Sequence, residues 1–100
     1  MTETRNYRDL DIWQRAVNIA VLVYQLTNDF PQSELYGLTS QMRRSAVSIA
    51  SNIAEGHSRS SREFVQFLSI ARGSVSELET QIEIASRIGL LPDMANDRVD

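Results

Sequence analysis

The sequence predicts an all-helical bundle, and three observations support this fold class. The 100 residues include only four Gly and two Pro, so long stretches lack helix breakers. Apolar residues recur at spacings of three and four in three long segments. Capping signals and turn residues separate these segments, without an alternating strand pattern or an internal repeat. A chain of this length forms one small domain, which we take as residues 1–100.

The composition is that of an ordinary globular protein, with 42% apolar and 23% charged residues. The absence of Cys removes disulfides, thiolate catalysis and zinc–cysteine sites, and it fits a reducing compartment. The first six residues are polar and lack an apolar signal core. No apolar run reaches the roughly 18–20 residues of a membrane span. We therefore expect a cytoplasmic protein that has no membrane partner.

The first predicted helix covers about residues 9–28, with Asp9 or Asp11 as its N-cap. Apolar residues surround most of its circumference, and only a stripe of Gln and Asn is polar. Such a helix needs burial on more than one side, which a 100-residue monomer does not easily supply. The sequence therefore predicts a homo-oligomer. Its candidate interface comprises Ile12, Ile19, Leu22, Val23 and Leu26.

The second predicted helix covers about residues 34–55 and begins at Glu34 or Leu38, with Ser33 as a candidate cap. Gly56 is expected to end it in the left-handed conformation. The helix is rich in Ser and Ala, which allow another helix to approach closely. The alternative is that these serines are simply solvated.

The third predicted helix covers about residues 61–88 and begins with a capping box formed by Ser60 and Glu63. Gly73 in its interior costs about 1 kcal/mol relative to Ala, and we expect a close helix contact to compensate for it. Gly89 closes the helix. The remaining segment, residues 93–100, has room for at most two helical turns.

Patterns typical of enzymes are missing. The only histidine, His57, has Ala54 three positions before it, so the Glu-x-x-His pattern of di-iron bundles is absent. Residues 56–60 resemble the start of a G-x-S-x-G motif, but Ser60 replaces the last Gly. No glycine-rich phosphate loop is present. We therefore expect a non-enzymatic protein without a catalytic residue, cofactor, metal or small-molecule substrate.

One segment is basic in a chain whose net charge is −3. Between residues 38 and 62, four arginines stand against Glu55 alone, and they are candidates for nucleic-acid binding. These candidates are Arg43, Arg44, Arg59 and Arg62. The alternative is that they pair with Glu55, Glu63 and Glu77 inside the bundle or across subunits. The acidic overall charge argues against a generic nucleic-acid binder.

Several strings carry a family resemblance: YRDLDIWQRA (7–16), FP (30–31), ELYGLTSQMRRSAVSI (34–49), SNIAEG (51–56), and EF, FL, ARGS and ELE (63–79). Together they resemble the bacterial four-helix bundle proteins of the 23S rRNA-intervening sequence protein family. Some relatives are accessory proteins of diversity-generating retroelements. The resemblance covers about residues 7–91.

This resemblance implies an up-down four-helix bundle that assembles into a ring-like homopentamer. For the retroelement relatives it also implies binding to a reverse transcriptase and to RNA or DNA through a basic surface. Arg43 and Arg44 match the family motif position by position, whereas Arg59 and Arg62 rest on local charge alone. The chain departs from the pattern in its acidic charge and in its short C-terminal segment, which we expect to be a truncated or vestigial fourth helix.

Two functional hypotheses follow. The first is a self-assembling helical bundle that serves as a scaffold or accessory factor in an RNA- or reverse-transcriptase-associated process. The alternative is a purely structural or protein-binding homo-oligomer that has no nucleic-acid role.

Overall fold

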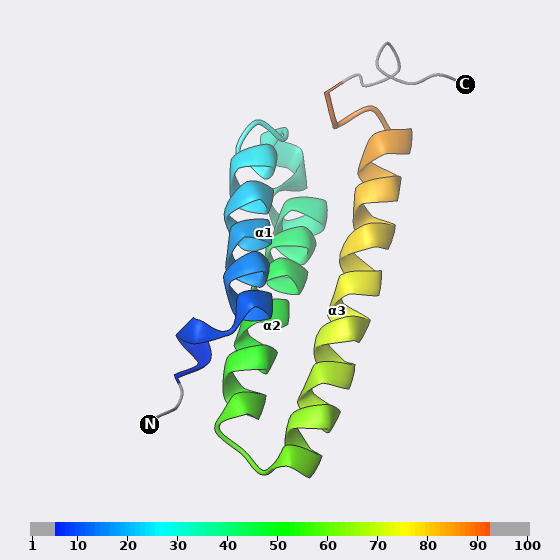
Figure 1. The fold of residues 1–100 in the computed structure, drawn as a ribbon. Coiled ribbons are helices and arrows are strands. Elements are labelled where there is room, and N and C mark those ends of the chain that lie inside the picture. Colours follow the sequence, from blue (N-terminus) through cyan, green and yellow to red (C-terminus); the bar gives the residue numbers. More distant parts are fainter. Residues whose placement is uncertain (1–5, 93–100) are drawn as a thin grey trace, which may run out of the picture.

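The computed structural model describes residues 6–92, and that part of the chain is all-helical (Figure 1). A 3₁₀ turn at Tyr7–Asp9 leads into helix α1, Asp11–Thr27. A second 3₁₀ turn, Gln32–Glu34, and a π-helical turn, Leu35–Thr39, precede α2, which covers Ser40–His57. The last helix, α3, covers Ser61–Arg87. The all-helical prediction is thus confirmed for the described residues, and the predicted short fourth helix at 93–100 lies outside them.

Helix α2 is the middle element of the fold. It packs against α1 and against α3, and successive helices run in opposite directions (Figure 1). The molecule is elongated, with principal extents of 49 × 31 × 20 Å. The buried apolar core runs along α2 and draws on all three helices. It consists of Ala16, Val23, Leu38, Met42, Ala46, Ile49, Ile53, Ala71, Leu78 and Ala85.

Both ends of α3 match their sequence signals. The Ser60 side chain accepts a hydrogen bond from the Glu63 amide at 3.2 Å, and the Glu63 carboxylate accepts one from the Ser60 amide at 3.4 Å. At the other end Gly89 has a φ of +84°. The Leu90 amide donates to the Ala85 carbonyl at 2.9 Å, which completes a Schellman motif. The predicted capping box and glycine terminator are confirmed.

The predicted N-caps of α1 and α2 are wrong. Leu10 occupies the cap position of α1 without a side-chain hydrogen bond, because Asp9 belongs to the preceding 3₁₀ turn and Asp11 is already helical. Before α2, Ser33 lies within a 3₁₀ turn. It is the Glu34 side chain that accepts a hydrogen bond, at 3.3 Å, from the Leu38 amide in the π turn. Irregular turns therefore precede both helices, and the identity of the candidate cap residues does not predict these turns.

Gly56 does not end α2, contrary to the prediction. The helix continues to His57, and Gly56 is buried against α3. A Cβ at this position would lie 2.5 Å from Cβ of Phe67 and 2.9 Å from Cδ1 of Phe64. Gly56 is therefore needed for the close approach of two helices and not for a left-handed turn.

Small side chains also occur further along the α2–α3 contact. The Ser74 hydroxyl donates to the Ser48 hydroxyl at 2.9 Å, and Ser45 and Ala46 are buried. These residues favour the tight-crossing interpretation of the Ser- and Ala-rich helix, whereas Ser51 is exposed. Gly73 behaves differently from the expectation, since it is exposed and a Cβ there would have nothing within 4 Å. No close contact within the described chain compensates for that glycine.

We predict opposite effects of alanine at the two glycines. Gly56→Ala should lower the free energy of unfolding by about 1–3 kcal/mol, because the added methyl group overlaps two phenylalanines. Gly73→Ala is the matched control and should raise it by up to about 1 kcal/mol through helix propensity. Urea denaturation at one fixed protein concentration measures both. Equal effects of the two substitutions would contradict the close approach at Gly56.

Candidate functional site

One side of α1 carries exposed aliphatic side chains, and we call it the α1 flank. It is formed by Ile12, Ile19 and Leu22, which are 45%, 38% and 62% exposed. The two other residues of the predicted interface are placed differently. Val23 is 4% exposed and belongs to the core, and Leu26 is half-buried against it. Three of the five predicted interface residues are therefore exposed in this chain and available to a partner.

A second apolar surface lies between α1 and α2, and we call it the α1–α2 groove. It has a volume of about 500 Å³. Its walls include Trp13, Val17 and Val21 from α1 together with Val47, Ala50 and Ala54 from α2. Because a helix turns about 100° per residue, Val17 and Ile19 point to nearly opposite sides of α1. Helix α1 therefore presents apolar surface on two sides, as its sequence pattern indicated.

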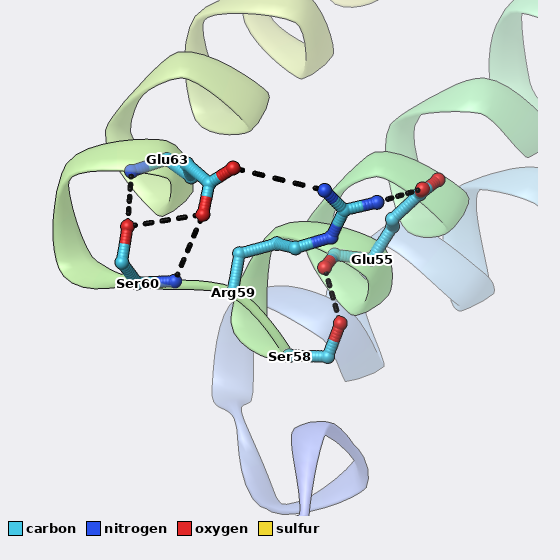
Figure 2. A network of polar contacts seen from close by, with 5 residues as sticks. All are labelled: Glu55, Ser58, Arg59, Ser60 and Glu63. Atoms are coloured by element: carbon cyan, nitrogen blue, oxygen red, sulfur yellow. Dashed lines mark hydrogen bonds and ion pairs between the residues drawn. The ribbon is translucent and has the colours of Figure 1, made fainter.

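Arg59 is held by two acidic side chains at the turn between α2 and α3 (Figure 2). Its Nη2 lies 2.9 Å from Oε2 of Glu55, and its Nη1 lies 3.7 Å from Oε2 of Glu63. The guanidinium also stacks 5.3 Å from the centre of the Phe67 ring. For Arg59 the interpretation as an intrachain ion pair is confirmed.

Arg43 connects α2 to the last turn of α1. Its Nε donates to Oγ1 of Thr27 at 2.8 Å, and its Nη2 donates to the Tyr24 carbonyl at 3.4 Å. The guanidinium lies 4.5 Å from the centre of the Tyr24 ring. Carbonyl groups at a helix C-terminus carry partial negative charge, which favours a cation there. Arg43 therefore has a structural role, which the local charge count did not reveal.

Arg44 and Arg62 are exposed, and neither forms an ion pair with another residue in 6–92. Arg44 lies in the first turns of α2, whereas Arg62 follows the opposite end of that helix. The length of α2 between them corresponds to about 20 Å at 1.5 Å per residue. The four candidate arginines therefore do not form one continuous patch in a single chain.

A pocket of mixed character lies where α1 ends and α2 begins, and we call it the junction pocket. It has a volume of about 490 Å³. Its lining includes Tyr24, Tyr36, Thr39, Ser40, Arg43 and Arg44. The Tyr36 side chain is 93% exposed, while Oγ1 of Thr39 is buried without a hydrogen-bond partner.

The predicted site residues did not include Tyr36, Thr39 or Ser40. In the sequence these three residues share only their position between Pro31 and the adjacent arginines Arg43 and Arg44. Tyr36 and Thr39 lie in the π turn, whereas Ser40 is the first residue of α2.

The described residues hold no group of three or more His, Cys, Asp or Glu that could bind a metal ion. His57 packs edge-on against Phe64, with ring centres 5.8 Å apart. No helix in residues 6–92 has both the length and the apolar character needed to cross a membrane.

Residues 6–92 thus form an all-helical fold that carries apolar surface on two sides of α1 and a pocket lined by tyrosines and arginines. The sequence also identifies the family. The chain belongs to the 23S rRNA-intervening sequence protein family, whose model matches residues 8–99. No curated protein matches the chain.

We predict that Arg43 contributes to stability and Arg44 does not. Arg43→Ala should lower the free energy of unfolding by about 1–3 kcal/mol, because it removes charge-assisted hydrogen bonds to the last turn of α1. Arg44→Ala is the adjacent control and should change it by less than about 0.5 kcal/mol. Thermal and urea unfolding followed by circular dichroism compare the two. An Arg43→Ala protein that is as stable as the wild type would show that these hydrogen bonds contribute little to stability.

Proposed function

We propose that this chain is a non-enzymatic, self-assembling helical module that serves as a scaffold or accessory factor in a cytoplasmic, RNA-associated process. The observation that carries the proposal is the exposure of apolar side chains on two sides of α1. Large exposed apolar surfaces mark interaction sites in folded proteins. A reverse transcriptase is one partner consistent with the proposal.

The proposed assembly is a ring-like homopentamer of up-down four-helix bundles. Helices α1 and α3 both pack mainly on α2, which leaves the α1 flank without a covering helix among the described residues. A fourth helix or a neighbouring subunit would bury it. The α1–α2 groove, on the opposite side of α1, offers a second contact surface. Two separate contact surfaces per chain are what a closed ring of heterologous contacts requires.

The RNA part of the proposal rests on the junction pocket and on Arg44, which is exposed there. The description of the family refers to an intervening sequence of ribosomal RNA, which is consistent with an RNA setting. The alternative is a homo-oligomer that binds only proteins. It is favoured by the internal bonds of Arg43 and Arg59, which leave fewer cations for phosphates.

We predict that the wild-type protein has about five times the 11.3 kDa mass of one chain in light scattering at micromolar concentration. Leu22→Glu on the flank and Val21→Glu in the groove should each lower the mass, because both side chains are exposed and a buried charge opposes association. Gln66→Glu, at an exposed position of α3, is the matched control and should leave the mass unchanged. A monomeric wild-type protein would refute self-assembly.

We predict salt-dependent retention of the wild-type protein on RNA. Arg44→Ala should reduce retention at low salt, because one cation near the phosphates is lost. Arg87→Ala is the control, since Arg87 is also exposed but pairs with Glu83 at 2.8 Å. Retention that is absent at low salt would remove the RNA part of the proposal and favour the protein-binding alternative.

A further inference from the structure

We propose that the junction pocket binds one nucleotide of single-stranded RNA, with the base stacked on Tyr36 and the phosphate held by Arg44. This inference rests on the RNA part of the proposed function and specifies its binding site. The pocket volume of about 490 Å³ lies within the range of about 300–1,000 Å³ that is usual for small-ligand sites.

The aromatic component of the site is unusually accessible. Tyr36 is 93% exposed, so it contributes little to the packing of its own chain. An exposed aromatic ring next to a basic group is the arrangement that stacks an unpaired base. Tyr24 lies across the same pocket, but its ring is already covered by Arg43 at 4.5 Å. Tyr36 is therefore the ring available for stacking.

The phosphate component combines a cation with hydroxyl groups. Arg44 is exposed and forms no ion pair with another described residue, so its guanidinium can bind a phosphate through two parallel hydrogen bonds. Arg43 is fixed in place by Thr27 and adds positive charge to the same wall.

Thr39 supplies an independent indication of a polar ligand. It is 3% exposed and lines the pocket, yet its Oγ1 has no hydrogen-bond partner among the described residues. Buried polar atoms in folded proteins nearly always have one. Ser40 lines the same pocket and supplies a second hydroxyl group there.

The site selects single strands because a base inside a duplex is already stacked on both faces. Tyr36, which is 93% exposed beside the pocket, can stack only on a base whose face is free, as in a single strand. Duplex RNA would contact the same arginines through its phosphates alone, without help from Tyr36.

The test compares a fluorescently labelled single-stranded RNA of about ten nucleotides with the corresponding duplex, using anisotropy and the full chain. Tyr36→Ala should weaken single-strand binding by roughly five-fold to a hundred-fold, the range that one stacked base contributes. Tyr36→Phe is the matched control and should restore it. The dependence of affinity on salt should be unchanged in Tyr36→Ala, whereas Arg44→Gln should reduce the slope by about 0.7, which corresponds to one phosphate contact. Thr39→Val should weaken binding while the protein remains folded.

The possible results separate this inference from the proposed function. If the wild-type protein binds RNA but Tyr36→Ala binds single strands equally well, the pocket assignment is overturned and the RNA role stands. The same holds if Tyr36→Ala weakens duplex and single-strand binding equally, because the effect is then not stacking on an unpaired base. If the wild-type protein binds neither the single-stranded nor the duplex RNA, the RNA part of the proposed function fails as well. Self-assembly is tested separately by light scattering.

Discussion

The close contact between α2 and α3 is the constraint on which the rest of this structure depends. At Gly56 the backbone of α2 meets Phe64 and Phe67 with no room for a side chain. Further along, the hydroxyl groups of Ser48 and Ser74 touch at 2.9 Å. The connecting turn is stabilised at the same end by the capping box and by the ion pairs of Arg59 (Figure 2). The contacts at the turn set the direction in which α3 leaves α2, and the Ser48–Ser74 hydrogen bond holds the two helices together further along.

Once α3 occupies one side of α2, α1 must pack on another, and Arg43 holds it there. The guanidinium of Arg43 binds Thr27 and the Tyr24 carbonyl, near the negative end of the α1 dipole. This use of Arg43 has a functional consequence. A residue that looks like a nucleic-acid ligand from its charge is committed to the fold, and the exposed cation at the same place is its neighbour Arg44.

The sequence predicted those features whose causes lie within a few residues. The two ends of α3 depend on Ser60, Glu63 and Gly89, and each acts on backbone groups no more than five residues away. Gly56 could not be assigned correctly, because glycine serves equally at a helix end and at a helix crossing, and only the position of α3 distinguishes them. The α1 apolar surface was predictable from periodicity. The junction pocket was not, because it joins residues from two helices through an irregular π turn.

The two parts of the proposed function depend on each other through electrostatics. Arg44 and Arg62 lie about 20 Å apart along α2, more than twice the screening length of about 8 Å at physiological salt. They therefore act separately, and among the described residues the junction pocket of one chain combines Arg44, which is exposed and forms no ion pair there, with the exposed ring of Tyr36. Under the proposed function, such a site would bind RNA weakly by itself. Repetition of the pocket in a ring would let one strand engage several copies, and linked contacts raise the effective affinity without new chemistry. In the proposed function, assembly through α1 is therefore the physical condition under which an acidic protein would retain RNA.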